Sequence, residues 1–130
     1  VLKTIQAIRQ KQQRIITVVG CGGNRDAGKR PLMAEIAARL SDFVVLTSDN
    51  PRKEDPLLIL NQMEAGIPKE KALAYSVCED RHQAIQQAIQ QLAKANDIVL
   101  VAGKGHETYQ DIQGVKHHFD DKEEVNKWLS

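Results

Sequence analysis

Short runs of apolar, mostly β-branched residues recur along this chain, and each is followed by a segment with helical spacing of apolar residues. The clearest runs lie at 14–20, 43–48 and 97–103, and a weaker one lies at 74–79. Strands that are apolar on both sides are typical of a parallel sheet covered on both faces. The pattern therefore predicts an α/β domain: a Rossmann-like, doubly wound, mostly parallel sheet with helices on both faces.

The segments between these runs carry the start and stop signals of helices. Pro31 suits the first turn of a helix. Asp55 is the expected N-cap of the next helix, and Gly66 its end. Asp80 and Gln83 are spaced as a capping box for a long helix. The helix that begins near Pro31 is expected to bury an apolar stripe made of Leu32, Met33, Ile36, Ala37 and Leu40.

Both ends of the chain also have helical patterns, at 1–12 and at 120–129. Before the last helix, residues 109–119 resemble a hairpin with Gly114 at its turn. This segment could add an antiparallel edge strand to the parallel sheet. The 130 residues are close to the usual size of one domain, so we expect a single domain over 1–130.

Composition excludes several classes of protein. Lys and Arg number 18 against 17 Asp and Glu, so the strongly basic face of a nucleic-acid binder is not expected. No apolar run approaches the roughly 20 residues of a membrane helix. Cys21 and Cys78 are expected to be reduced, as in a cytoplasmic protein. His117 and His118 have no partners at metal-ligand spacing, so no metal site is predicted.

Polar, glycine-containing segments follow three of the predicted strands: "GCGGNRDAGKR" at 20–30, "SDNPR" at 48–52 and "AGKGHE" at 102–107. In open α/β sheets, ligands bind beyond the carboxyl ends of the strands, so these segments are expected to meet at one edge. Arginine binds carboxylates, whereas acidic and amide groups bind ammonium. Together they would suit a zwitterion such as an amino acid.

The first of these segments has the G-x-x-x-x-G-K spacing of a nucleotide-binding P-loop, from Gly23 to Lys29. The next position of a P-loop is Ser or Thr, which coordinates Mg²⁺. Arg30 stands there and has no acceptor atom. Pro31 also removes a backbone N–H from the helix start. A glycine turn that presents cations to an anion fits this segment better than a true P-loop.

The stretches "GCGGNRDAGKRPLM", "TSDNPRKEDP" and "VLVAGKGHETYQ", in this order and spacing, resemble the C-terminal domain of the MurE-type Mur ligases. These enzymes are UDP-N-acetylmuramoyl-tripeptide synthetases of peptidoglycan synthesis. The resemblance covers essentially the whole chain. In this family the D-N-P-R motif marks enzymes that add meso-diaminopimelate rather than L-lysine.

The resemblance implies a reaction in the bacterial cytoplasm. ATP phosphorylates a carboxylate of UDP-MurNAc-L-Ala-D-Glu, and the amine of diaminopimelate attacks the acyl phosphate. The family's central domain binds ATP and Mg²⁺, and its third domain positions the amino acid. This chain resembles only that third domain. It is therefore expected to be one part of a three-domain ligase, with no catalytic residue of its own and no activity in isolation.

The resemblance also implies binding roles for particular residues. Arg52, with Asn50, would bind the distal carboxylate of diaminopimelate, which lysine lacks. Gly103 and Glu107 would hold the distal ammonium. Lys29 and Arg30 would either face the phosphates of ATP or have a merely structural role. The full set of expected amino-acid-binding residues is Arg25, Asp49, Asn50, Pro51, Arg52, Gly103 and Glu107.

Two other functions remain open at this point. One is a free-standing phosphate- or nucleotide-binding module of the doubly wound class. The other is a non-enzymatic interaction domain.

Overall fold

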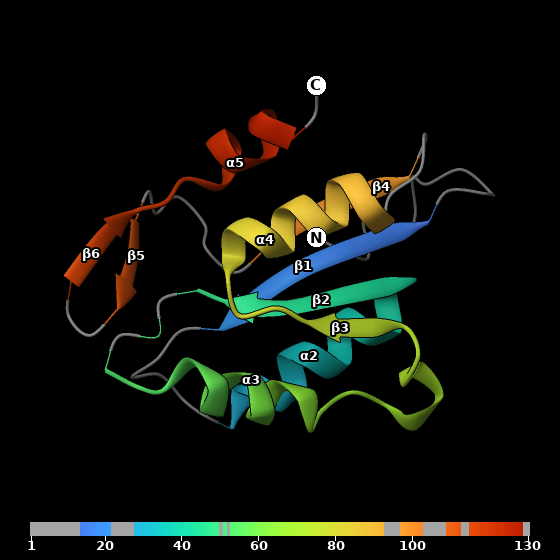
Figure 1. Cartoon of the computed structure of the whole chain (residues 1–130). Helices are drawn as coiled ribbons and strands as arrows, with labels where there is room; N and C mark the ends of the chain where they lie inside the picture. The colour runs from blue at the N-terminus through green and yellow to red at the C-terminus, as the bar shows by residue number, and fades with distance from the viewer. Residues whose placement is uncertain are drawn as a thin grey trace.

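The computed structural model of the chain describes residues 14–21, 28–49, 51, 53–92, 97–102, 109–112 and 115–128. Its centre is a four-stranded parallel sheet in the order β3-β2-β1-β4 (Figure 1). The strands are β1 (Ile15–Cys21), β2 (Phe43–Ser48), β3 (Tyr75–Val77) and β4 (Ile98–Ala102). The four apolar runs thus form the predicted strands, and the parallel arrangement is confirmed.

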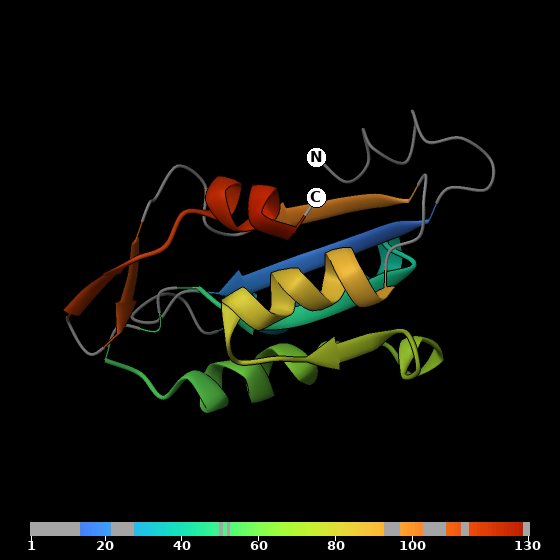
Figure 2. The ribbon, with the colours of Figure 1, turned by 45° about the horizontal axis from the view of Figure 1, so that its top comes forward.

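Helices cover both faces of this sheet, as predicted. Figures 1 and 2 show α2 (Lys29–Leu40) and α3 (Pro56–Glu64) on one face. The other face carries α4 (Arg81–Gln86), its π-helical continuation η2 (Gln87–Leu92) and α5 (Asp121–Trp128). The short 3₁₀-helix η1 (Lys69–Lys71) lies between α3 and β3. None of the described helices has the length and apolar character that crossing a membrane requires.

Side chains alternate along β1 between the two layers of the core. Val19 and Cys21 pack with α2 and α3, whereas Ile16 and Val18 pack with α4 and Phe119. This alternation follows from the two-residue period of a strand. Both faces of β1 are buried along its whole length, which explains why its sequence is mostly apolar; the one polar side chain, Thr17, shares a hydrogen bond with the Ser41 hydroxyl.

The predicted helix caps are present. The Asp55 side chain accepts a hydrogen bond from the Leu57 N–H at 2.9 Å, and Asp80 accepts from His82 N–H at 2.9 Å. Asp80 also accepts from Gln83 N–H at 3.5 Å. The helix after Asp80 is α-helical over Arg81–Gln86 and continues as the π-helix η2 over Gln87–Leu92.

The expected apolar stripe of α2 is confirmed at Ala37, which is buried, and is wrong at Leu32, Met33 and Ile36, which are exposed. Leu32 and Ile36 are each 56% exposed, whereas the buried residues of this helix include Ala34, Ala37 and Ala38. Alanines on the inner face let the helix approach the sheet closely. The larger apolar residues Leu32, Met33 and Ile36 lie on the outer side of the helix, whereas hydrophobic periodicity predicted that they face the core.

The expected edge strand is also corrected. β5 (Tyr109–Ile112) and β6 (Val115–His118) pair only with each other, as a separate antiparallel hairpin, within the part of the chain that is described. In Figures 1 and 2 this hairpin lies beyond the carboxyl ends of β1 and β2. The Gln110 side chain donates to the Asp49 carbonyl at 2.6 Å and links the hairpin to the end of β2. The helix predicted over 1–12 lies outside the described residues.

Close packing of α2 on α3 predicts that Gly66→Ala is destabilising. A Cβ at Gly66 would lie 1.9 Å from the Pro31 carbonyl oxygen, and that backbone must shift to admit it. We expect a loss of about 1–3 kcal/mol in the free energy of unfolding, measured by urea denaturation. The neighbouring change Ala65→Gly, at an exposed helical cap, should cost no more than about 1 kcal/mol. Equal losses in the two variants would contradict the steric explanation.

Candidate functional site

The topology places a candidate site at the carboxyl edge of the sheet. From β1 the chain winds outward through β2 to β3 and then returns to β4 on the other side of β1. The winding direction therefore reverses between β1 and β4, and such switch points open a crevice for ligands at the carboxyl ends of the strands. The segments that leave β1, β2 and β4 at this edge are the three that the sequence singled out.

Several of the predicted amino-acid-binding residues lie outside the described residues. These are Arg25, Asn50, Arg52, Gly103 and Glu107. Their convergence in space stays a prediction. The structure does place the strand ends that carry them. Cys21 pairs with Ser48, and Val19 pairs with Ala102, so the carboxyl ends of β2 and β4 flank the end of β1.

Asp49 and Pro51, the two described members of this set, are both buried at the end of β2. The Asp49 carbonyl is bound by Gln110 from the hairpin, as described above. Pro51 accepts a backbone hydrogen bond from Glu54 N–H at 3.0 Å, which closes a turn before α3. These contacts hold the backbone of Asp49 and of Pro51 in place at the end of β2.

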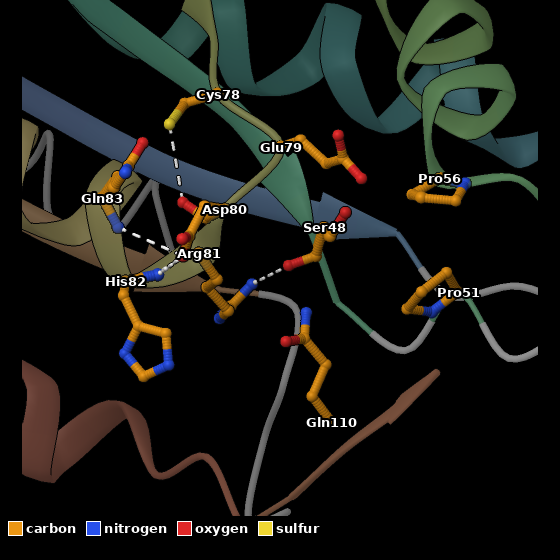
Figure 3. Close-up of a pocket in the computed structure, with 10 residues that line it drawn as sticks. All are labelled: Ser48, Pro51, Pro56, Cys78, Glu79, Asp80, Arg81, His82, Gln83 and Gln110. Carbon is orange, nitrogen blue, oxygen red and sulfur yellow. Dashed lines mark hydrogen bonds between the residues drawn. The ribbon is translucent and has the colours of Figure 1, made fainter. Parts of the chain in front are cut away.

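A cavity of about 560 Å³ opens beside Pro51 (Figure 3). It lies between the end of β2, the first turn of α4 and the hairpin. Its walls carry carboxylates, amides, an imidazole and a thiol, together with two prolines. The lining residues are Ser48, Pro51, Pro56, Cys78, Glu79, Asp80, Arg81, His82, Gln83 and Gln110.

The two cations at the start of α2 differ in their surroundings. Lys29 is exposed. The Arg30 side chain is only 3% exposed, and its Nη2 lies 2.9 Å from Oε2 of Glu54. Arg30 Nη1 also donates to the Gln62 side-chain oxygen at 2.7 Å. These contacts join α2 to α3 and favour the structural alternative for Arg30, whereas Lys29 remains available to a ligand.

The pKa of Cys21, the last residue of β1, is affected by the charged groups near this edge. Burial raises the pKa of its thiol from 9.0 to about 11. The Arg30 guanidinium opposes this rise in pKa, and the Asp49 carboxylate adds to it. A buried cation and a buried carboxylate thus act on the same strand end, and the thiol stays protonated and unreactive at neutral pH.

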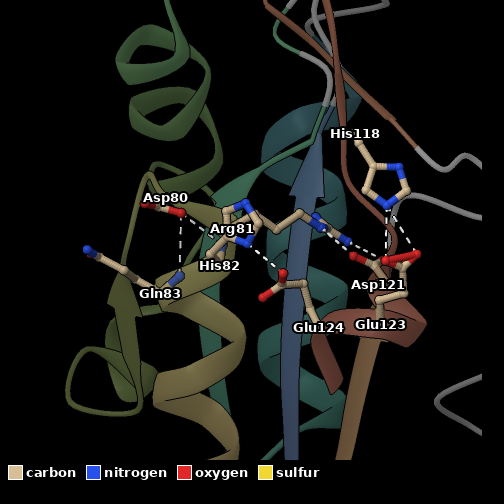
Figure 4. A network of polar contacts seen from close by, with 8 residues as sticks. All are labelled: Asp80, Arg81, His82, Gln83, His118, Asp121, Glu123 and Glu124. Carbon is tan, nitrogen blue, oxygen red and sulfur yellow. Dashed lines mark hydrogen bonds and ion pairs between the residues drawn. The ribbon is translucent and has the colours of Figure 1, made fainter. Parts of the chain in front are cut away.

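Arg81 is the residue of this edge that sequence reasoning missed. It is 1% exposed and contacts three segments that are distant in sequence; Figure 4 shows its contact with Asp121. Nη1 donates to the Ser48 carbonyl at 3.1 Å and Nη2 to the Ala102 carbonyl at 3.3 Å. Nε and Nη2 donate to the Asp121 carboxylate at 2.9 and 2.8 Å. The only signal in the sequence is an arginine immediately after an N-cap, a position that usually faces solvent.

Histidines and carboxylates continue the network of Figure 4 along α5. His82 Nδ1 lies 2.7 Å from Glu124 Oε1, and the His82 ring packs on Phe119 with 4.3 Å between centroids. His118 Nε2 lies 3.0 Å from Glu123 Oε1, and this contact raises the pKa of the exposed His118 ring. Despite these pairs, the described residues contain no group of three or more metal-ligating side chains arranged to hold an ion.

Comparison with known proteins gives consistent similarities. A family model described as "Mur ligase, glutamate ligase domain" matches residues 1–105. Proteins named UDP-N-acetylmuramoyl-L-alanyl-D-glutamate--2,6-diaminopimelate ligase are 54% identical in Bacteroides fragilis, over 100% of this chain and 27% of that protein. The identity is 58% in Cytophaga hutchinsonii, over 94% of this chain and 25% of that protein.

A solved structure of a protein with the same name also matches. Its TM-score is 0.88 at 46% identity, and the match covers 98% of this chain and 26% of that one. The chain therefore spans about a quarter of the length of the proteins it matches.

The raised pKa of Cys21 predicts a specific loss of stability at alkaline pH. Between pH 9 and about 11 the unfolded chain releases this thiol proton and the folded chain keeps it. The contribution to stability is therefore complete below pH 9 and is lost as the pH rises through this window. Urea unfolding at pH 8 and at pH 10.5 should show a smaller alkaline loss in Cys21→Ala than in the original chain. An equal loss in both would rule out this thiol as the cause.

Proposed function

The chain belongs to the Mur ligase family, and from that premise we propose that it is the amino-acid-positioning domain of a meso-diaminopimelate-adding ligase. The full enzyme would join this amino acid to UDP-MurNAc-L-Ala-D-Glu with the use of ATP, in the bacterial cytoplasm. The observation that carries the proposal is the identity of 54% over the whole chain to a protein named for this reaction. The solved structure with the same name has the same fold over 98% of the chain.

The arrangement of the carboxyl edge supports a binding role for this domain. Asp49 and Pro51 belong to the D-N-P-R segment, and both are buried at the end of β2. Arg52 follows them directly and would pair with the distal carboxylate of diaminopimelate. Arg25, which leaves β1, would bind the same amino acid. Gly103 and Glu107, which follow β4, would hold the distal ammonium.

These residues would bind and orient the amino acid, and the chemistry would take place between domains. Orientation of an amine against an activated carboxyl group is itself a large part of catalysis, because it replaces an encounter in solution by a fixed geometry. Closure of this domain over the acyl phosphate would also exclude water, which competes with the amine. The step forms a C–N bond and releases phosphate, and the amine loses a proton.

ATP and Mg²⁺ enter the proposal as requirements of the whole enzyme. Mg²⁺ would be bound mainly by the central domain of the whole enzyme, and the described residues contain no group of three or more metal-ligating side chains. Lys29 is exposed at the start of α2 and would face the phosphates of ATP when the domains close. Arg30 is left out of this role because it is buried against Glu54 and Gln62.

Arg52→Ala in the full-length ligase tests the proposed selectivity. The KM for meso-diaminopimelate should rise by about tenfold or more, because a charged hydrogen bond worth about 1.5–3 kcal/mol is lost. Discrimination against L-lysine should fall, since lysine lacks the carboxylate that Arg52 would bind. Lys53→Ala, an exposed cation next to it, is the matched control and should change neither quantity. Unchanged KM and unchanged discrimination in Arg52→Ala would refute the assignment.

Lys29→Ala tests the proposed contact with ATP. We expect the KM for ATP to rise severalfold, on the order of the loss of one charge-assisted contact, while the KM for diaminopimelate stays constant. Lys69→Ala, an exposed lysine in η1 before the amino end of β3, serves as the control. A rise in the KM for diaminopimelate alone would place Lys29 in the amino-acid site instead.

Calorimetry separates the proposal from the nucleotide-binding alternative. Tight, Mg²⁺-dependent binding of ATP by this chain alone would favour a free-standing nucleotide-binding module. Ligation of meso-diaminopimelate by the full-length protein, with ATP consumed in equal amount, would favour the ligase.

A further inference from the structure

Near the end of β1, Gly20 leaves the face that carries α4 without a side chain. Gly20 lies between Val19 and Cys21, which point to the opposite face with α2 and α3. A Cβ at Gly20 would lie 2.9 Å from Nη1 of Arg81 and 2.8 Å from the carbonyl carbon of Ser48. Because Gly20 has no side chain, the Arg81 guanidinium can lie directly over the strand.

From this position Arg81 reaches the strands on both sides of β1. Its Nη1 binds the carbonyl of Ser48, the last residue of β2, and its Nη2 binds the carbonyl of Ala102, the last residue of β4. These two residues directly precede the two groups of predicted binding residues, 49–52 and 103–107. One planar group therefore joins the two points from which these segments leave the sheet.

Asp121 holds the guanidinium in this orientation. The two oxygens of its carboxylate accept from Nε and Nη2 in the bidentate geometry that restricts an arginine most strongly. Asp121 is the first residue of α5. Phe119 lies two residues before it, and the centroid of its ring is 5.9 Å from Cζ of Arg81. Figure 4 shows the arginine side chain extended from α4 toward Asp121.

The fold does not need these contacts to align its strands. The backbone ladder already pairs Cys21 with Ser48 and Val19 with Ala102. What Arg81 adds is a direct connection between β2 and β4, which are not neighbours in the sheet. That connection spans β1 between the starting points of the two segments.

We propose that Arg81, oriented by Asp121, is a positioning residue that sets the spacing between the two halves of the amino-acid site. It acts through the carbonyls of Ser48 and Ala102 and does not touch the substrate. The inference rests on the proposed function, because the two segments form one site only if they bind one amino acid. A molecule charged at both ends depends on that spacing more than a substrate bound elsewhere in the enzyme.

A second arginine–aspartate pair supplies a matched control. Arg14 binds the Asp97 carboxylate through Nε at 3.2 Å and Nη2 at 2.7 Å, and also donates to the Leu92 carbonyl. This pair joins β1 and β4 at their amino ends, the opposite edge of the sheet. It matches the Arg81 pair in its bidentate chemistry, with an Arg14 side chain that is 43% exposed, and it lies at the edge of the sheet opposite the ends of β1, β2 and β4 from which the binding segments leave.

The test compares Arg81→Lys and Asp121→Asn with Arg14→Lys and Asp97→Asn in the full-length ligase. Lysine keeps the charge at position 81 but cannot bind both carbonyls and the carboxylate at once. For Arg81→Lys we expect the KM for meso-diaminopimelate to rise about tenfold or more, since misplacement by about 1 Å can cost a hundredfold. The KM for ATP and for the UDP-linked substrate should stay within about twofold. Asp121→Asn, which keeps one acceptor oxygen, should give a smaller shift of the same kind.

The melting temperature of each variant separates positioning from general destabilisation. We expect Arg14→Lys and Asp97→Asn to lower it without a selective change in the KM for diaminopimelate. A KM for diaminopimelate within about twofold of the original enzyme in a folded Arg81→Lys or Asp121→Asn protein would overturn the inference. Equal effects on all three substrates, or the same selective effect at Arg14, would also overturn it. Activity of the original ligase with meso-diaminopimelate tests the proposed function, and its absence would refute that function. The variants test only the role of Arg81.

Discussion

One buried guanidinium joins the segments that meet at the carboxyl edge of this sheet. Arg81 is almost completely removed from water, so its charge and its N–H groups must be compensated inside the protein. The Asp121 carboxylate supplies the compensating negative charge. The carbonyls of Ser48 and Ala102 accept hydrogen bonds from Nη1 and Nη2 of Arg81. Meeting this demand brings α5 and the ends of β2 and β4 to the same place. Removing the Asp121 carboxylate would leave the buried guanidinium without its charged partner, at a cost of about 3–5 kcal/mol.

Arg30 satisfies a similar demand on the opposite face. It is buried with Glu54 and Gln62, and these contacts favour a structural role over that of a phosphate ligand. Lys29, one residue earlier, is exposed. The two cations are adjacent in sequence, yet one joins α2 to α3 and the other faces solvent. This difference arises because the side chains of successive helical residues point in directions about 100° apart around the helix axis.

The predicted fold follows from local features that the sequence carries directly. Mostly apolar runs identified the strands, and Asp55 and Asp80 cap the helices as their spacing indicated. The inner face of α2 could not be predicted, because alanine spacing and leucine spacing are both compatible with an amphipathic helix. For the site, Asp49 and Pro51 were predicted and lie at the expected edge, whereas Arg81 was not predicted. Its partners come from three distant segments, and no local pattern marks them.

By itself, the sequence determined the parallel α/β class, the order of strands and helices along the chain, and the segments that leave the sheet at its carboxyl edge. These depend on residue types and spacings within a few positions. Only the tertiary structure decided that Gly20 leaves room for Arg81, that the hairpin stands apart from the sheet, and that Leu32 and Ile36 face outward. Each of these depends on which distant residues share one buried space, and burial is a property of the packed chain.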